Sequence, residues 1–302
     1  MTLIVIAGAT ATGKSDLSIA LAERIGAEVV NADSMQLYRG MDIGTAKLSL
    51  DQRKGIPHHL IDLLEVTEDA SVAQYQKWAR EKIDQLLAEG KKVIVVGGTG
   101  LYIKSILDEL NFPDTDPIVR ARLSLEAHQI GIDAMHARLA QLDPAAAAAI
   151  PKENARRVVR ALEVIEITGA PFTANLPKAG ASYYPSAQQF GLVMQRDDLK
   201  ERIDKRVDAM WEAGLVDEVR GLIEAGITKA KTARAALGYS QIITFLEGAT
   251  TEEEALAETK RATRAYARRQ ETWFSRDERI KWLKGDLSER LDAILSSTIG
   301  RA

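Results

Sequence analysis

The hydrophobic pattern alternates between two kinds of segment, which predicts an α/β protein. One kind is a short, nearly continuous apolar run, typical of a strand buried in a parallel sheet. The other kind has apolar residues at helical spacing, as at Leu17, Leu21 and Ile25. The strand signals lie at residues 3–7, 27–31, 58–62, 93–96 and 190–194. We therefore expect a P-loop type of α/β core, with a mainly parallel sheet flanked by helices.

The strand signal disappears in the middle of the chain. Helical patterns follow one another at residues 120–130, 134–142, 144–150 and 154–168. We interpret residues 116–177 as a small all-helical insertion domain. Residues 1–115 and 178–302 then form one catalytic core.

Capping signals mark several helix ends in the core. Ser71 followed by Gln74 fits a capping box, which starts a helix. Asp197 or Asp198 is expected to cap a later helix, which Gly214 stops. Beyond it we expect helices to the end of the chain, so that the sheet is complete before they begin.

Composition narrows the class of protein. The 302 residues are 46% hydrophobic and 27% charged, with a net charge of −3, as in ordinary globular proteins. Cysteine is absent, which excludes disulfides and thiolate metal sites and is compatible with a reducing cytoplasm. The first strand signal begins at once, leaving no room for a signal peptide, and no apolar run is long enough to span a bilayer. We expect a cytoplasmic monomer that makes no membrane contact.

The most specific motif separates the first strand from the first helix. Two glycines separated by four residues precede a lysine and a serine, and the motif reads Gly8, Ala9, Thr10, Ala11, Thr12, Gly13, Lys14, Ser15. A strand, a glycine-rich turn and a helix N-terminus direct backbone N–H groups at one point, which suits a phosphate. Lys14 would add a positive charge, and the Ser15 hydroxyl could ligate Mg²⁺. The alternative is a chance pair of glycines in a tight turn.

Two polar residues follow strands at the carboxyl edge of the expected sheet, where parallel α/β proteins bind ligands. Asp33 follows the second strand and is the carboxylate best placed to act as a general base beside the phosphate. Its alternative is a turn or helix-cap aspartate. Thr99 lies in a glycine-flanked turn, where its hydroxyl would either orient an acceptor or serve the turn alone.

The aspartate that usually holds Mg²⁺ in nucleotide-hydrolysing P-loop enzymes is missing. The strand at residues 93–96 ends in a glycine-rich turn instead, and Asp62 is only a partial substitute. His58 and His59 lack a partner at metal-ligand spacing, so we interpret them as structural or surface residues. A motor or switch ATPase is therefore disfavoured, whereas a small-molecule kinase or another transferase stays open.

Two basic stretches stand out from the balanced charge of the chain. Arg156, Arg157 and Arg160 lie on a predicted helix of the insertion. Residues 256–284 carry nine basic and four acidic side chains, a local charge of +5. Its interleaved aromatic residues and the arginines that recur on one helical face are Tyr266, Trp273, Trp282, Arg261, Arg264 and Arg268. Such a stretch is either a solvated charged face or a surface for phosphates and unstacked bases.

Taken together, these motifs resemble those of the tRNA dimethylallyltransferases, also called tRNA isopentenyltransferases. The resemblance keeps the family's order and reaches from Gly8 to Phe274. The matching pieces are residues 8–15, 31–47, 58–62, 97–102, 154–164, 237–241 and 268–274, of which residues 33–47 are the most specific. The phosphate loop departs slightly, because the family commonly has proline where Ala9 stands and threonine where Ser15 stands. Ser15 keeps the hydroxyl.

The resemblance implies transfer of a dimethylallyl group from dimethylallyl diphosphate to N6 of the adenosine 3′-adjacent to the anticodon in tRNA. The phosphate loop and Arg206 would hold the diphosphate, and Lys14 with Mg²⁺ on Ser15 would neutralise its charge. Asp33 would accept the N6 proton, and Thr99 would hold the adenosine. The implied tRNA contacts are Asp33, Ser34, Met35, Gln36, Thr99, Arg120, Arg156, Arg157, Val158, Val159, Arg160, Arg234, Gly238, Tyr239, Gln241, Arg268 and Arg269.

Three rival functions remain at this point, and one of them is an RNA-binding protein whose loop only senses a nucleotide, which any turnover would exclude. An isopentenyltransferase acting on free adenine nucleotides would lack the helical insertion and the C-terminal arginines, both of which this chain has. A P-loop small-molecule kinase would consume ATP and ignore dimethylallyl diphosphate.

Overall fold

The computed structural model describes residues 2–175 and 181–299, and these form two compact units. The first unit combines Met1–Leu107 with Tyr184–Ala302, and the second is Asp108–Tyr183. The second unit thus begins at Asp108, ahead of the boundary at residue 116 expected from sequence. The other expected boundary, at residues 177 and 178, lies outside the described residues. No helix in the described ranges is long and apolar enough to cross a membrane.

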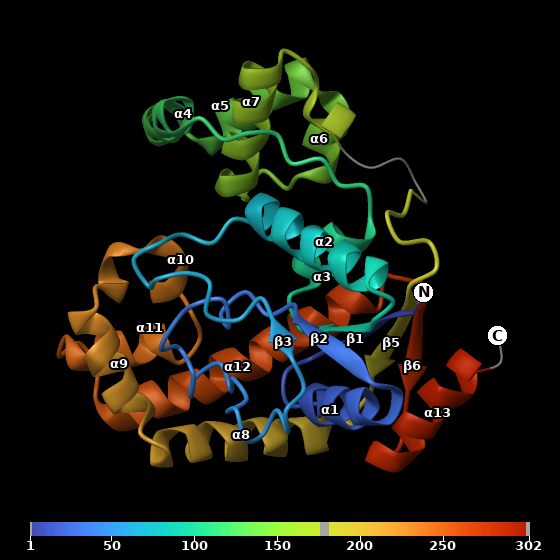
Figure 1. The fold of residues 1–302 in the computed structure, drawn as a ribbon. Coiled ribbons are helices and arrows are strands. Elements are labelled where there is room, and N and C mark those ends of the chain that lie inside the picture. Colours follow the sequence, from blue (N-terminus) through green and yellow to red (C-terminus); the bar gives the residue numbers. More distant parts are fainter. Residues whose placement is uncertain (1, 176–180, 300–302) are drawn as a thin grey trace. The chain divides into compact units, whose positions relative to one another are not determined.

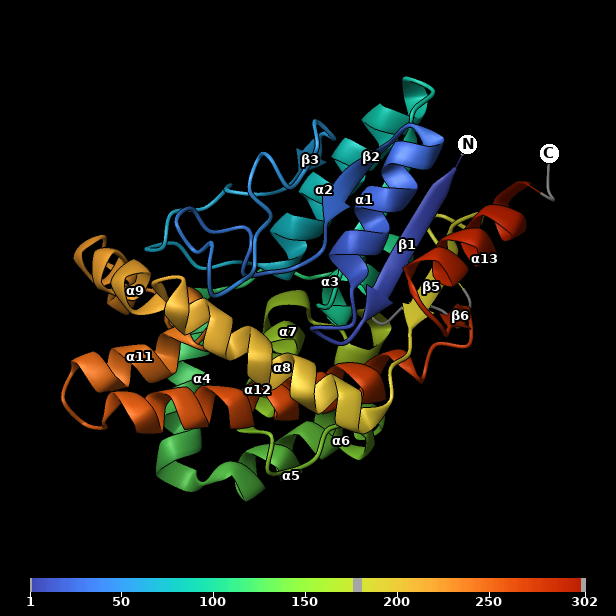
Figure 2. The same ribbon diagram turned by 90° about the horizontal axis from the view of Figure 1, so that it is seen from below.

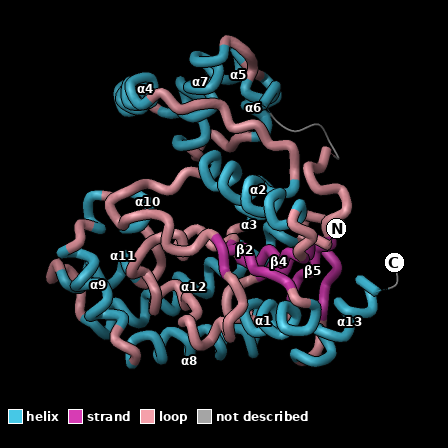
Figure 3. The backbone as a smooth tube through the Cα atoms, in the orientation of Figure 1, coloured by secondary structure: helices cyan, strands magenta, loops and turns pink. Residues whose placement is uncertain are grey.

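A six-stranded, fully parallel sheet forms the centre of the first unit (Figures 1 and 3). Its strand order is β3-β2-β4-β1-β5-β6. The strands are β1 (Leu3–Gly8), β2 (Ala27–Asn31), β3 (His58–His59), β4 (Lys92–Gly97), β5 (Gln188–Leu192) and β6 (Ile280–Leu283). The expected fold class, a P-loop α/β core with a parallel sheet, is confirmed.

The edges of the sheet differ from the sequence-based expectation. Strand β3 is short because Leu60 and Asp62 adopt positive φ angles, 60° and 56°, which end the extended backbone. At the opposite edge lies β6, so the prediction of helices alone after residue 197 was wrong. The burial pattern of β6 is buried, exposed, exposed, buried. Because its exposed residues Lys281 and Trp282 form part of the basic stretch, the sequence shows no apolar run there.

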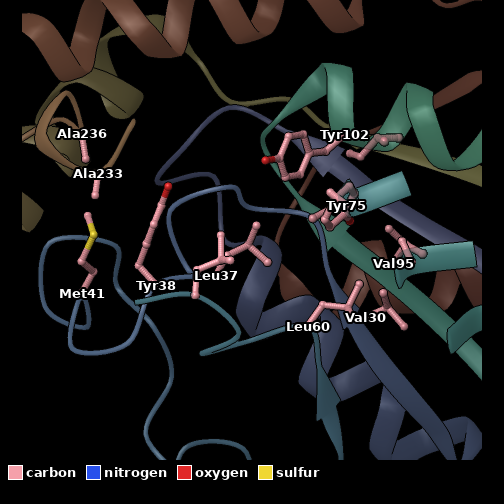
Figure 4. Packing of buried hydrophobic residues seen from close by; sticks show 14 of the residues in the cluster. Val30, Leu37, Tyr38, Met41, Leu60, Tyr75, Val95, Tyr102, Ala233 and Ala236 are labelled. Carbon is pink, nitrogen blue, oxygen red and sulfur yellow. The ribbon is translucent and has the colours of Figure 1, made fainter. Parts of the chain in front are cut away.

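Alternate residues of the central strands pack into two separate hydrophobic cores, one on each face of the sheet. Helices α2 (Val72–Ala88) and α3 (Gly100–Leu107) cover one face, and α1 (Lys14–Ile25) and α13 (Leu287–Ile299) cover the other (Figure 1). In β1, for example, Val5 packs into the first core and Ile4 into the second. Figure 4 shows part of the first core, in which the Tyr75 and Tyr102 rings stack with centroids 4.0 Å apart.

The C-terminal helices gather beside the carboxyl ends of the strands. They are α8 (Arg196–Glu212), α9 (Leu215–Glu224), the 3-10 turn η2 (Ile227–Lys229), α10 (Lys231–Arg234), α11 (Tyr239–Leu246) and α12 (Glu252–Phe274). Helices α8 and α12 run side by side (Figure 2), and α12 also contacts β1 and α3. The long α12 therefore reaches the edge of the sheet where the phosphate loop lies.

The structure corrects two of the predicted helix caps, although the helix start at Ser71 is confirmed. Ser71 is the N-cap residue of α2, but its side chain makes no capping hydrogen bond, so the capping box with Gln74 does not form. Helix α8 begins after Gln195, and Asp197 and Asp198 lie within its first turn. Acidic residues there still favour the helix through its dipole, which explains why the sequence resembled a cap.

The second unit has a core of its own. Its elements are α4 (Pro117–Ile130), α5 (Ile132–Leu142), α6 (Pro144–Ala149), α7 (Ala155–Thr168) and the 3-10 turn η1 (Phe172–Asn175). Asp116, Asp143 and Asn154 cap α4, α6 and α7 with their side chains. Leu123, Leu139 and other apolar residues of the four helices form its buried cluster.

Candidate functional site

The phosphate loop, residues 8–15, turns from β1 into α1. Gly13 is the N-cap of α1 at φ 92°, a left-handed conformation that glycine adopts without strain. Within the loop, Thr12 Oγ1 and Lys14 Nζ both donate to the Ala9 carbonyl, at 2.8 and 2.7 Å. The loop is thus closed by its own side chains, and the helix N-terminus points its dipole into the space in front.

A polar cavity of about 690 Å³ opens at this loop. Its polar and charged lining residues come from the phosphate loop and the start of α1, from the strand ends, from residues 42–52 and from α8 and α12: Thr10, Lys14, Ser15, Asp16, Asn31, Asp33, Gln36, Asp42, Thr45, Lys47, Gln52, Arg202, Lys205, Arg206, Tyr266 and Gln270. Every element that contributes is part of the first unit. A cavity of this size with a cationic wall suits a phosphorylated ligand.

Two cations at this cavity are electrostatically perturbed. Burial and the neighbouring charge of Arg206 lower the pKa of Lys14 to about 8, against a smaller opposing effect of Asp33. Burial also lowers the pKa of the Arg206 guanidinium, which Asp33 and Asp16 partly restore. At both cations the effect of burial outweighs that of the acidic neighbours. A polyanionic ligand would therefore stabilise their charged forms.

Asp33 lies where β2 ends, in the wall of this cavity. The Asn31 side chain fixes its backbone, because Oδ1 of Asn31 accepts from Asp33 N at 2.9 Å and Nδ2 donates to Asp33 O at 3.0 Å. One carboxylate oxygen, Oδ1, accepts the amide of Met35 at 2.9 Å. The turn-aspartate interpretation is therefore correct for one oxygen, and it orients the carboxylate rather than excluding a chemical role.

Thr99 lies between the same strand ends. Its Oγ1 accepts the amide of Ser34 at 3.2 Å, so it joins the turn after β4 to the segment that carries Asp33. Burial, with a further effect of Asp33, raises the pKa of the nearby Tyr266 to about 12, and the Tyr266 hydroxyl interacts with the Thr99 side chain. Asp33, Thr99 and Tyr266 thus form one cluster.

A second cavity, of about 350 Å³, adjoins the polar one. Thr10, Asp33, Arg206 and Tyr266 line both cavities. The second cavity is otherwise largely apolar, and its lining includes Met35, Ile203, Val207, Met210, Leu215, Leu237 and Tyr239, together with Arg269 and several hydroxyl side chains. A charged space and an apolar space therefore meet at a carboxylate.

The loop at residues 41–47 forms a wall of both cavities and is held at two points. Glu218 of α9 accepts the Ile43 amide at 2.7 Å and the Tyr239 hydroxyl at 2.6 Å. At the other end Lys47, with only 3% of its side chain exposed, bridges Asp42 and Asp62 at 2.5 and 2.6 Å. The Asp62 carboxylate is thus occupied by an ion pair with Lys47.

No cluster of three or more His, Asp or Glu side chains able to hold a metal exists in the part of the chain that the structure describes.

The expected tRNA-contacting residues of the first unit divide into surface and buried positions. Arg268 and Arg269 are exposed on α12, where they line an open hollow together with Trp273 and Arg276. Arg234 is exposed beside Glu247. Tyr239 is fully buried, and Gln241 Oε1 accepts the Gly238 amide at 2.9 Å. Their part in binding tRNA stays a prediction.

The expected contacts of the second unit divide in the same way. Arg156 and Arg157 are exposed at the start of α7, whereas Val158 and Val159 are buried in the core of the unit, so their side chains are not available at the surface. The buried carboxylate of Glu163 pairs with Arg120 at 2.7 Å and with Arg160 at 3.0 Å. Arg120 and Arg160 therefore also have a structural role.

The arginines that recur along α12 differ in their partners. Arg264 pairs with Asp204 of α8 at 2.6 Å, and Arg261 pairs with Glu258 on its own helix at 2.6 Å. Trp282 lies on β6, away from this helix. His59 pairs with Glu28, and His58 Nδ1 bonds the Ile56 carbonyl, both in line with a structural role.

Sequence reasoning missed several residues of the site. Two further cations of α8 line the polar cavity. Arg202 lies one helical turn before Arg206, and Lys205 directly precedes Arg206 in the sequence. The buried Arg290 of α13 donates to the Thr12 carbonyl at 3.0 Å, and the buried Gln270 of α12 accepts the Thr10 amide at 2.9 Å. Helical spacing from Arg206 could have indicated Arg202. Arg290 and Gln270 lie 278 and 260 residues from their partners, and no local pattern predicts such contacts.

Comparisons with known proteins agree with this geometry. The family model described as IPP transferase matches residues 36–277. The tRNA dimethylallyltransferases of Streptomyces griseus and Thermobifida fusca are 58% and 59% identical to this chain, over 95% and 96% of it and 92% of each relative. The crystal structure of the tRNA isopentenylpyrophosphate transferase of Bacillus halodurans covers 99% of this chain, with 96% of its own chain covered, at 39% identity and a TM-score of 0.73. A eukaryotic dimethylallyltransferase acting on tRNA covers 99%, with 80% of its own chain covered, at 28% identity and a TM-score of 0.84.

The matches to the relatives and to the solved structures extend over nearly the whole chain, whereas the family model begins at residue 36, after the phosphate loop and Asp33. They confirm the resemblance that the sequence motifs indicated. The chain therefore belongs to the IPP transferase family, the family of the tRNA dimethylallyltransferases.

Proposed function

We propose that the protein transfers a dimethylallyl group from dimethylallyl diphosphate to N6 of the adenosine 3′-adjacent to the anticodon in tRNA. Family membership supports the reaction class. The observation that carries the proposal is that the polar and apolar cavities meet at Asp33 and Arg206. A charged leaving group and uncharged reacting groups would occupy the two spaces, with the carboxylate at the junction.

The polar cavity fits the diphosphate. The amides of the phosphate loop, Lys14 and Arg206 supply positive potential on one side of it. In the reaction the allylic C–O bond breaks and its electrons leave with the diphosphate, so cations that stabilise the departing charge lower the barrier. The apolar cavity then surrounds the hydrocarbon and the purine, and it keeps water away from the reactive carbon.

Asp33 fits the general base. The adenine amine is a poor nucleophile because its lone pair is delocalised into the ring, so removal of its proton as the N–C bond forms assists attack by about 10²–10⁴-fold. Oδ1 of Asp33 already accepts the Met35 amide, so we assign proton acceptance to Oδ2. The products are modified tRNA, diphosphate and a proton on Asp33. A stacked base cannot reach this junction, so the adenosine must be flipped out.

The site also fits Mg²⁺ bound together with the diphosphate. Ser15 faces the polar cavity, and the described residues offer no carboxylate cluster that would hold the ion alone. Mg²⁺ prefers oxygen ligands and retains waters, so one hydroxyl with diphosphate oxygens is a suitable donor set. When bound, the ion would neutralise charge on the leaving group. The protein itself contributes Ser15 and the orientation of the loop amides.

One experiment tests the proposal against its rivals. The protein is incubated with unmodified tRNA and labelled dimethylallyl diphosphate, and the digested tRNA is searched for N6-(dimethylallyl)adenosine. We expect the label in tRNA and none in free adenine nucleotides supplied in its place. Label only in the free nucleotide, or phosphate transfer from ATP with no use of the isoprenoid, would refute the proposal. The expected monomeric state stays a prediction, which gel filtration of the same sample checks.

A further inference from the structure

The side chain of Gln270 connects the two turns that hold opposite sides of the candidate site. Its Oε1 accepts the amide of Thr10 in the phosphate loop at 2.9 Å. Its Nε2 donates to the carbonyl of Gly98, in the turn after β4, at 2.8 Å. Gln270 is 6% exposed. Because one planar amide makes both bonds, it ties the two turns together beyond the last pair of the β1–β4 ladder, Ala7 and Gly97.

The turn after β4 is pressed closely against this face of α12. A Cβ at Gly98 would lie 2.2 Å from Gln270 Nε2, and a Cβ at Gly100 would lie 2.1 Å from Trp273 Cδ1. Side chains other than hydrogen are therefore excluded at both positions. The close contact leaves the Gln270 side chain no space to shift toward the turn. Rotation of its amide in the other direction would break both hydrogen bonds.

In the proposed reaction, one of the two turns holds the leaving group and the other lies beside the residues that hold the adenosine. Thr10 belongs to the cradle of the leaving group. Gly98 precedes Thr99, which binds the Ser34 amide beside Asp33. Tyr266, one helical turn before Gln270, interacts with the side chains of both Thr99 and Gln270. One face of α12 therefore contacts the diphosphate side and the adenosine side together.

We propose that Gln270 is a positioning residue that fixes the phosphate loop relative to the Thr99–Asp33 pair. The inference rests on the proposed transfer reaction, in which the allylic carbon on the diphosphate must approach N6 of adenosine. Reacting atoms need to lie about 3–3.5 Å apart, and a misplacement of about 1 Å can reduce a rate about 100-fold. Gln270 spans the two segments that hold the partners of this approach. It acts through Thr10 and Gly98 and does not touch the reacting atoms.

The test compares Gln270→Glu and Gln270→Ala with the wild type. Gln270→Glu keeps the volume and an acceptor for Thr10, but it places an oxygen against the Gly98 carbonyl. Gln270→Ala removes both bonds. The matched control is Gln85→Ala, which changes an exposed glutamine of α2. The measurements are the single-turnover transfer rate at saturating tRNA and dimethylallyl diphosphate, the Kd values of tRNA and inorganic pyrophosphate, and the Tm.

We expect the transfer rate at saturation to fall about 10- to 100-fold in both Gln270 variants. The two Kd values should change less than about threefold, because the groups that bind each substrate remain. A wild-type rate in the variants would overturn the inference. So would a loss that appears only as weaker binding, or a failure of both variants to fold, since Gln270 would then be a binding or core residue. A wild type that shows no transfer would instead refute the proposed function.

Discussion

Asp33 is the residue on which the proposed chemistry depends, and its surroundings separate its two roles. Oδ1 holds the turn through Met35, and the residue also lines both cavities. An asparagine at this position keeps the Oδ1 acceptor and loses the capacity to take a proton. The change therefore tests chemistry without breaking the turn.

We predict that Asp33→Asn lowers the single-turnover transfer rate at least about 100-fold. The Kd for tRNA should stay within about threefold, since a neutral amide preserves the turn that shapes the segment. Asp51→Asn, a change at an exposed loop position, serves as the control. Transfer near the wild-type rate in the Asp33 variant would remove this residue from the mechanism.

The pKa of Lys14 predicts how diphosphate binding depends on pH. Burial and Arg206 lower this pKa from 10.5 to about 8, so the free protein loses the lysine charge as the pH rises past about 8. A bound diphosphate favours the charged form, so binding takes up a proton above that pH, and the affinity falls as pH rises. Titrations of inorganic pyrophosphate from pH 7 to 9.5 should show this weakening in the wild type.

The comparison protein for this titration is Lys14→Arg, because an arginine keeps its charge over the whole range. Subtraction of its pH profile removes the titration of pyrophosphate itself. The same pH dependence in both proteins would contradict the assignment to Lys14.

At the scale of elements, the loop at residues 41–47 is shaped by helices that follow it by more than 170 residues in sequence. Glu218 of α9 binds its amides, and Gly44 packs against the ring of Tyr239, where a Cβ would lie 2.5 Å from Cε2. Figure 4 shows Met41 of this loop beside Ala233 and Ala236 of the C-terminal segment. The cavity wall therefore depends on the packing of α9 to α11.

We predict that Gly44→Ala lowers the free energy of unfolding by about 1–3 kcal/mol, because the buried Tyr239 ring must move. Gly221→Ala is the matched control. Gly221 lies exposed within α9, and nothing lies within 4 Å of an added Cβ, so this change should raise stability by about 0.5–1 kcal/mol. Urea denaturation of the three proteins measures both values. Equal effects of the two substitutions would show that Gly44 is not confined by Tyr239.

At the scale of the whole molecule, exposed basic residues occur on both compact units. Arg268 and Arg269 lie on α12 of the first unit, and Arg156 and Arg157 lie on α7 of the second. Each unit has its own core, so substitutions on one surface should leave the fold of the other unchanged. Both surfaces suit the proposed tRNA substrate, because each presents cations that ion pairs do not bury.

We predict that reversing the charge of either pair to glutamate weakens tRNA binding and reduces its salt dependence. Each lost phosphate contact lowers the slope of log K against log salt by about 0.7–0.9. The Kd of inorganic pyrophosphate should be unchanged in both double variants. Arg220→Glu, on the exposed side of α9, is the control. A wild-type salt slope in either double variant would classify that surface as an ordinary solvated face.

Local pattern alone determined much of this protein. The central strands, the helices of the second unit, the phosphate loop and Asp33 at a strand end were all predictable. Their signals lie within a few residues of each other, in apolar periodicity and in turn chemistry. The same local signals missed β6 and the details of two caps. They also placed β5 two residues too late, because it begins with the polar pair Gln188 and Gln189.

Tertiary structure alone decided how the site is held and which charges remain available. Gln270 and Arg290 reach the phosphate loop across most of the chain length, and Arg264 is neutralised by Asp204. Such contacts depend on how distant elements pack, and that packing leaves no periodic trace in sequence. The sequence therefore specified the chemical groups of the site, and the fold determined their distances, partners and exposure.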